Sequence, residues 1–246
     1  MKKLFYLLIL LSACKSNPDK KLEATVQPDS SGAMRPADTT FLLKEAQKGF
    51  YHAVFIEKNR ESKVYKRLLD FKYDHYDSIA YNENYKILKV KFKKPLKKYD
   101  VASLGQDWLP LYAYKGKYYL YAPSDWGNTG RRRLTDSTLT YWSVDGPDLK
   151  PLLSFKKIND SKYSLTSQPF YQFVKKSNIN IYIIDPKNKV AVWEDTALPA
   201  DYRYGLYVPV QFAQNFDMVH NYCKTDKMPE FVFDKIDFKA LIKGFN

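Results

Sequence analysis

The segment from Asp125 to Arg133 holds the residues best suited to binding chemistry. It reads Asp-Trp-Gly-Asn-Thr-Gly-Arg-Arg-Arg. Two glycines can turn backbone amides inward around an anion, and arginine offers paired donors to phosphate or carboxylate. Neighbouring residues of a strand point to opposite faces, so Arg131 and Arg133 would act together. We take both, with Trp126, as candidate binding residues; a solvated cationic loop is the simpler interpretation of the same residues.

Four tyrosines form a second candidate surface, on a hairpin whose strands are 109–114 and 118–122. Placing Gly116 first in a two-residue type II′ turn collects them on one face. They are Tyr112, Tyr114, Tyr119 and Tyr121, with Tyr114 opposite Tyr119 and Tyr112 opposite Tyr121. Such a face predicts a platform for sugar rings or an extended peptide. Packing of the same face against a second sheet is the alternative.

Signals for catalysis are weak. The three histidines are scattered, and none of the patterns HExxH, GxSxG or GxxxxGK[ST] occurs. His75 stands between Asp74 and Asp77, but one histidine with flanking acids is a poor metal motif that a polar loop explains equally well. A carboxylate pair for glycoside hydrolysis is defined by distance in the fold and is invisible in the sequence. We therefore predict no catalytic residue, no metal site and no cofactor.

Composition indicates a folded, basic protein. The 246 residues include 40 Lys and Arg against 27 Asp and Glu, a formal net charge of +13, with 45% hydrophobic and 16% aromatic residues. This is enough apolar material for a packed core and excludes disorder throughout. Nine glycines are few and argue against glycine-rich nucleotide loops. Two cysteines cannot build a disulfide scaffold or a Cys-rich zinc site.

The N-terminus has the features of an export signal. Lys2 and Lys3 precede the apolar run Leu4–Leu11, and Ser12-Ala13-Cys14 follows. The apolar run is too short to span a bilayer, which takes about 20 residues.

The residues Leu11-Ser12-Ala13-Cys14 closely resemble the lipobox of bacterial lipoprotein signal peptides, and the resemblance covers only the first 14 residues. It implies cleavage before Cys14, a diacylglyceryl thioether on its sulfur and, usually, acylation of its new amino group. Two or more acyl chains hold a protein firmly on a membrane. An ordinary secretory signal in which Cys14 happens to fall is the alternative.

The residue after the cysteine bears on the destination. Lys15 stands where an aspartate typically retains such lipoproteins at the inner membrane, so the resemblance implies the outer membrane, with the domain facing the periplasm. The segment 15–19 lacks the acidic run that some lineages use for surface display. With Cys14 acylated, Cys223 has no disulfide partner in the chain and is expected to be a small buried residue; a catalytic thiol is the minority alternative.

The chain divides into three parts. Residues 1–13 are the predicted signal peptide, 14–40 the lipidated cysteine and a flexible tether, and 41–246 a single β-rich domain. Residues 15–40 contain no Phe, Tyr or Trp and would span roughly 28 Å as a flexible coil.

The domain is predicted to be mainly β, as an antiparallel sandwich or open barrel, with short helices near its N- and C-termini. The helices are expected at 41–48, 210–223 and 238–243, and one hairpin turns at Pro186. The expected strands are 50–57, 63–71, 85–92, 109–114, 118–122, 137–144, 151–157, 162–167, 179–184, 189–194 and 204–210.

Three functions fit these features. The first is a binding module attached to the membrane through its N-terminal lipid, with an envelope protein, an anionic glycan or an anionic lipid as partner. The second is a hydrolase of an envelope polymer that uses carboxylates. The third is a carrier of lipophilic ligands, which needs a closed barrel with an apolar cavity. Nucleic acid is not an expected partner of an exported protein.

Overall fold

The computed structural model describes residues 39–246, except 94, 128, 144, 169–175, 225–226 and 246. The predicted signal peptide, Cys14 and all but the end of the tether lie outside the described residues. Within these ranges, no helix combines the length and the apolar composition that crossing a bilayer requires.

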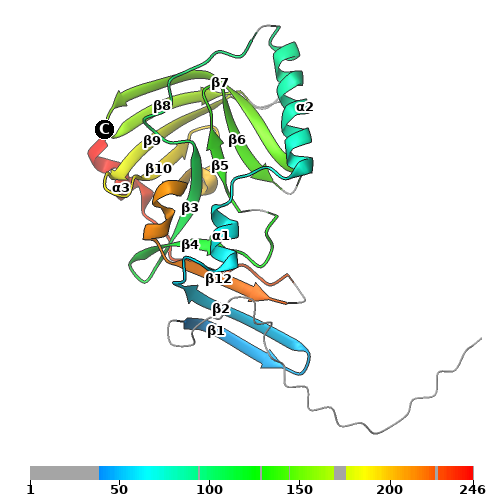
Figure 1. The fold of residues 1–246 in the computed structure, drawn as a ribbon. Helices are drawn as coiled ribbons and strands as arrows, with labels where there is room; N and C mark the ends of the chain where they lie inside the picture. Colours follow the sequence, from blue (N-terminus) through cyan, green and yellow to red (C-terminus); the bar gives the residue numbers. More distant parts are fainter. Residues whose placement is uncertain are drawn as a thin grey trace, which may run out of the picture. The chain divides into compact units, whose positions relative to one another are not determined.

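Eight strands form a closed antiparallel barrel (Figure 1). Neighbours around the barrel are β3 (Asp107–Tyr114), β11 (Tyr204–Pro209), β10 (Val190–Asp195), β9 (Ser177–Asp185), β8 (Lys162–Ser167), β7 (Gly146–Asn159), β6 (Thr138–Ser143) and β5 (Arg132–Leu134). The ring closes because β5 pairs back with β3. The predicted mainly β class is confirmed, and the barrel is closed rather than open. Closure leaves none of these strands with a free edge.

Four further strands extend the sheet from β3. They are β4 (Lys117–Ala122), β12 (Met218–Cys223), β2 (Phe50–Glu57) and β1 (Thr40–Gln47), and β12 runs parallel to β4. The predicted helix at 41–48 is wrong, because this segment is β1. Gly49, at φ 83°, instead closes a two-residue turn that pairs β1 with β2. A glycine after a polar segment fits a helix end and a hairpin equally, and strand pairing decides between them.

The helices lie mostly away from the predicted positions. The predicted strands 63–71 and 85–92 are wrong: the first is α1 (Lys63–Leu69) and the second falls in the C-terminal half of α2 (His75–Lys91). The side chains of Ser62 and Asp74 cap the first turns of the two helices. The segment 210–223 is the 3₁₀ helix η3 (Val210–Asn215) followed by β12. Near the C-terminus, α3 (Phe238–Ile242) is confirmed, with Asp237 as its cap. Two short 3₁₀ turns, η2 (Ala200–Tyr202) and η4 (Lys243–Phe245), complete the elements.

Apolar side chains pack on both surfaces of the barrel wall. Inside, the rings of Trp108 and Trp193 meet edge to face, 5.3 Å apart, among isoleucine and leucine side chains. Outside, Val192 and Leu206 belong to a second cluster that includes residues of α1, η3 and α3. Among the described residues, large apolar side chains thus line much of the interior of the barrel.

His220 on β12 gives the fold a predicted sensitivity to acid. Its ring packs edge-on against Phe55 at 5.0 Å, and burial lowers its pKa from 6.5 to about 4. Below pH 6.5, His220 therefore binds a proton in the unfolded chain, whereas in the folded chain it binds one only when the pH falls to about 4. Stability should thus be full above pH 6.5 and fall as the pH drops towards 4.

We expect His220→Phe to flatten the dependence of the melting temperature on pH across this range. His75→Phe, at an exposed position on α2, is the control and should keep the dependence of the parent protein. An equally steep dependence in His220→Phe would show that His220 does not cause the acid sensitivity.

Candidate functional site

Arg131 and Arg133 do lie on one side of the barrel wall, but groups of the protein itself occupy them. Arg133 donates through Nε and Nη2 to the two carboxylate oxygens of Asp107, at 2.6 and 3.1 Å. Arg131 donates to the carbonyl oxygens of Arg67 and Asp70, both at 2.7 Å, at the C-terminal end of α1. Carbonyls at a helix end otherwise lack partners. Arg133 also donates through Nη2 to the carbonyl oxygen of Phe71, just after α1, at 2.7 Å, so both arginines fasten α1 and the segment after it to the barrel.

Trp126 also contacts α1. The guanidinium of Arg67 lies over its ring, 4.2 Å from the centroid. The neighbouring carboxylate of Asp125 pairs with Lys227 at 2.7 Å. The structure thus brings the predicted loop residues together around α1, where each already has a partner within the chain.

The tyrosine hairpin has a different register from the predicted one. Tyr112 pairs with Tyr119, and Tyr114 pairs with Lys117. The turn is Lys115-Gly116 with φ 48° and 74°, which are the positive angles of a type I′ turn. Because the register differs by two residues, the four tyrosines still share one face.

The segment 230–234 covers this face. The rings of Tyr112 and Phe233 stack with centroids 4.6 Å apart, and Phe231 meets Tyr114 edge-on at 5.2 Å. Tyr119 is only 7% exposed. Tyr119 and Tyr121 are therefore buried in a core cluster, and Tyr112 and Tyr114 pack partly buried against it, beneath the chain's own C-terminal segment.

Arg132 points the opposite way, into the barrel. Its guanidinium carbon lies 4.1 Å from the ring centroid of Tyr207 and 5.1 Å from those of Tyr141 and Trp193. Its buried Nε has no hydrogen-bond partner. No carboxylate of the described residues forms an ion pair with it, in contrast to Arg133 next to it. Arg132 is thus a partly buried cation surrounded by aromatic rings.

Lys150 adds a second positive charge beside the same rings. Its Nζ lies 4.2 Å from the centroid of Tyr141 and 3.6 Å from the carboxylate of Asp148. Burial raises the pKa of the Tyr141 hydroxyl to about 12, with Arg132 opposing the shift and Asp195 adding to it. We call this group, which five barrel strands contribute, the Arg132 cluster. Its members are Arg132, Tyr141, Lys150, Trp193 and Tyr207.

Within the Arg132 cluster, Lys150 has the Asp148 carboxylate beside it, whereas Arg132 has no ion-pair partner among the described residues. Removing a guanidinium from water is costly, and a cation–π contact returns only about 0.5–2 kcal/mol. Trp193 carries another unsatisfied donor, because its buried Nε1 has no partner within the described ranges. A carboxylate or phosphate oxygen is the acceptor that such donors match best. The cluster is therefore suited chemically to an anionic ligand.

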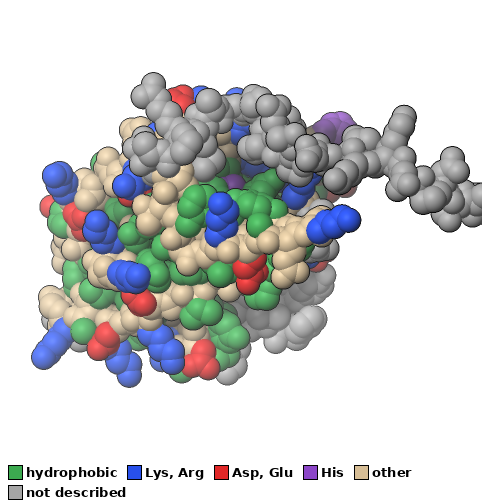
Figure 2. Space-filling view, turned by 90° about the horizontal axis from the view of Figure 1, so that it is seen from below, with side chains coloured by type: hydrophobic (Ala, Val, Ile, Leu, Met, Phe, Trp, Pro, Cys, Tyr) green, Lys and Arg blue, Asp and Glu red, His purple; other side chains and the backbone are tan. Residues whose placement is uncertain are grey.

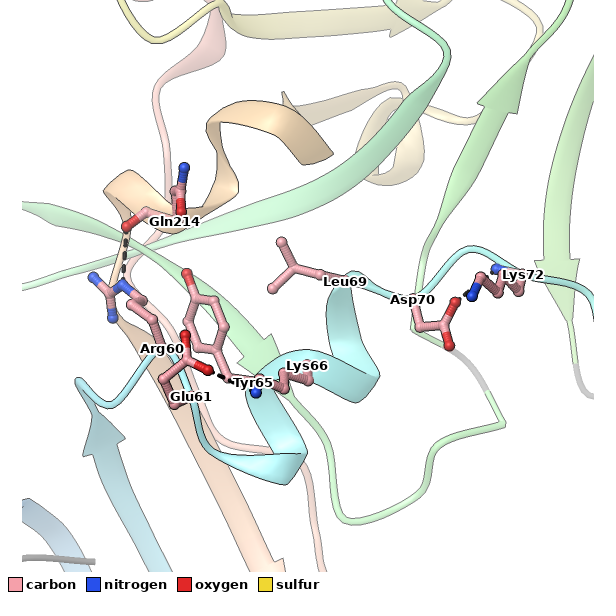
Figure 3. Close-up of a pocket in the computed structure, with 8 residues that line it drawn as sticks. All are labelled: Arg60, Glu61, Tyr65, Lys66, Leu69, Asp70, Lys72 and Gln214. Atoms are coloured by element: carbon pink, nitrogen blue, oxygen red, sulfur yellow. Dashed lines mark hydrogen bonds and ion pairs between the residues drawn. The ribbon is translucent and has the colours of Figure 1, made fainter. Parts of the chain in front are cut away.

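Two pockets outside the Arg132 cluster, one beside α1 and one beside residues 99–106, offer no comparable chemistry. The one in Figure 3, of about 370 Å³, lies beside α1, and several of the charged groups that line it have partners within the chain. Glu61 pairs with Lys66 at 2.6 Å, and Arg60 donates to the carbonyl oxygen of Gln214 at 2.9 Å. In a second pocket, of about 430 Å³, Lys98 holds the pKa of Asp136 below its usual range. A hydrolase needs a carboxyl group with a raised pKa as its acid, and these pockets do not show one.

The other residues considered for chemistry lie apart. His75 is the first residue of α2, directly after its cap Asp74, and not in a loop between strands. Cys223 is a free, partly exposed thiol three residues after His220 on β12, so their side chains point to opposite faces. The described residues contain no group of three His, Cys, Asp or Glu side chains placed to bind a metal ion.

Sequence patterns did not identify the Arg132 cluster, because its members come from strands up to 75 positions apart. The alternation within Arg131-Arg132-Arg133 does separate Arg132 from its neighbours, and only closure of the barrel makes that side the interior. Comparison with protein-family models, with curated proteins and with solved structures finds no match for this chain.

Proposed function

We propose that this protein is a lipid-anchored envelope lipoprotein whose barrel binds a carboxylate-bearing ligand at the Arg132 cluster, such as a uronic acid of an envelope glycan. One observation carries this proposal: Arg132 lies partly buried against three aromatic rings without a carboxylate partner in the described chain. Its neighbour Arg133 is fully engaged by Asp107 and gives the contrast within one strand.

The rings prepare Arg132 for such a ligand. They fix the plane of the guanidinium and exclude part of its water, so a carboxylate meets oriented donors at a reduced desolvation cost. Arg132 and Lys150 also approach one ring, that of Tyr141, at 5.1 and 4.2 Å. Asp148 offsets the charge of Lys150, at 3.6 Å, whereas Arg132 has no such carboxylate among the described residues, so an anionic ligand beside Arg132 would lower the electrostatic energy of the pair of cations. Both effects favour a carboxylate over a neutral sugar.

The anchor is proposed from the N-terminal residues. If Cys14 carries the lipid, the tether of roughly 28 Å keeps the domain near the bilayer surface. A ligand attached to the same envelope is then met at a high local concentration, so a modest intrinsic affinity suffices.

The anchor is tested with Cys14→Ser expressed in a bacterial host with labelled palmitate. We expect the parent chain to incorporate the label and to stay with membranes in high salt, because acyl chains resist salt. The variant should carry no label and should leave the membranes in high salt. A variant that stays membrane-bound in high salt contradicts the lipid anchor.

The ligand site is tested by titrating the protein with glucuronate and following tryptophan fluorescence, since Trp193 is part of the cluster. Arg132→Met should weaken binding at least tenfold, because a charge-assisted hydrogen-bond pair is lost. Neutral glucose should not bind. Lys187→Met removes one exposed charge elsewhere and should bind like the parent.

Equal affinities of Arg132→Met and the parent, in variants with unchanged circular dichroism, would contradict the site. Equal affinities for glucose and glucuronate would contradict its preference for an anion.

A further inference from the structure

A second concentration of positive charge lies outside the barrel, on α2 and the segment after it. Residues 86–98 contain seven lysines and neither aspartate nor glutamate. They are Lys86, Lys89, Lys91, Lys93, Lys94, Lys97 and Lys98. Clusters of four to eight lysines or arginines next to apolar side chains are typical of segments that lie on anionic bilayers.

Large apolar side chains are exposed along the same helix. Tyr76 is 80% exposed, Ile79 49%, Ile87 46% and Val90 77%. Steps of three, eight and three residues place all four within one stripe of the helix surface. Glu83 shares this stripe, and its carboxylate pairs with Lys86 at 3.4 Å.

The opposite face of α2 attaches it to the barrel. Leu88 is fully buried, and the helix lies along the outside of the barrel against β7 (Figure 1). The exposed stripe therefore faces away from the barrel wall, and its apolar groups are held there by a packed helix.

Such a concentration of charge is not found on every face. Figure 2 views the molecule from the end where β1 and β2 lie, and there the Lys and Arg side chains are spread among acidic, hydrophobic and other groups. The segment 86–98 has no acidic residue between its lysines, and of these lysines Lys86 pairs with Glu83 and Lys98 with Asp136. Its positive charge is thus a local feature and not simply the average of a basic protein.

We infer that α2 and the following segment form a docking surface for an anionic lipid bilayer. Ile87 and Val90 enter the interface between headgroups and acyl chains, while Lys86, Lys89 and Lys93 meet the lipid phosphates. A bilayer fits better than a folded partner, because lysine is a flexible point charge suited to mobile headgroups. When Cys14 is acylated, the tether also keeps the domain close to the membrane, with a root-mean-square span of roughly 28 Å. The docking surface does not involve the Arg132 cluster.

The test uses the full chain carrying Cys14→Ser, so that no acyl chain contributes to binding. Binding is measured by sedimentation with vesicles of phosphatidylcholine alone and of phosphatidylcholine mixed with phosphatidylglycerol. We expect binding to the anionic vesicles only, weakening as salt is added. Replacing Lys86, Lys89, Lys93 and Lys97 by glutamine should lower the partition coefficient roughly 100-fold. The double variant Ile87→Ser, Val90→Ser should lower it roughly tenfold.

A matched control variant distinguishes the effect of the docking surface on vesicle binding from the effect of net charge. Lys58, Lys156, Lys187 and Lys235 are exposed lysines on other elements, and their replacement by glutamine removes the same charge. This control should bind the vesicles almost as well as the parent. All variants have the same N-terminus, so any vesicle binding by the N-terminus is equal in all of them and cancels in the comparison. Equal losses in the two quadruple variants would overturn the inference, as would binding of the α2 variant at the level of the parent.

Glucuronate affinity and melting temperature should be unchanged in the α2 lysine variant. Loss of vesicle binding with intact glucuronate binding supports the docking surface whether or not the Arg132 cluster has been correctly assigned. If the parent chain does not bind anionic vesicles, a bilayer is not the partner of this surface. The same conclusion follows if the chain binds an acidic protein but not the vesicles.

Discussion

Closure of the barrel depends on β5, a strand of only three residues. Its backbone pairs Arg132 with Trp108 and Arg133 with Asp107 on β3. The ion pair between Arg133 and Asp107 spans the same two strands, with its side chains 15% and 17% exposed. Hydrogen bonds to a carboxylate in such partial burial are stronger than at the surface, because water competes less. The three-residue strand β5 is therefore held against β3 both by backbone pairing and by a side-chain ion pair.

The alternation of β5 then determines what each arginine does. Arg131 and Arg133 point outward and hold α1 and Phe71 just after it, while Arg132 points inward among aromatic rings. A shift of one residue in the register of β5 would exchange these sides, because side chains alternate with a period of two. The closure of the barrel, the seating of a helix and the placement of an interior cation all follow from this one pairing.

The two proposed binding surfaces use different cations for different physical reasons. Arg132 is planar and held by rings, which suits recognition of a carboxylate of fixed geometry. The lysines of segment 86–98 are flexible and strongly hydrated, which suits a fluid layer of headgroups. One surface lies inside the barrel and the other on its outside, so a lipid-anchored domain could use both at once.

The sequence predicts this fold correctly where local turn and cap preferences agree with the long-range pairing of strands and packing of helices. The hairpin around Pro186 and the helix after Asp237 are examples, since turn and cap residues there coincide with the apolar pattern. Segment 41–48 is a counterexample, because Gly49, which follows it, suits the end of a helix and the turn of a hairpin equally. Apolar β-branched and aromatic residues around 85–92 suggested a strand, yet the cap at Asp74 starts a helix that continues through them.

For the candidate binding residues, too, the sequence does not show partners that lie far away along the chain. Alternation correctly places Arg131 and Arg133 on one side, but their acceptors include carbonyls 61 and 64 positions earlier, which no local pattern contains. The basic run at 86–98 is visible in the sequence, whereas the exposed apolar stripe beside it requires the helix and its packing to be known. Side chains that act together from distant strands become recognisable only when the barrel is closed.

The most direct measurement of this account compares the free energies of unfolding of Arg132→Met and Arg133→Met by urea denaturation. Arg133→Met leaves the Asp107 carboxylate without its partner and should cost about 3 kcal/mol. Arg132→Met replaces a cation without a carboxylate partner by an apolar side chain among rings and should change stability by less than about 1 kcal/mol. If Arg132→Met costs as much as Arg133→Met, then Arg132 is a structural residue and the central claim is contradicted.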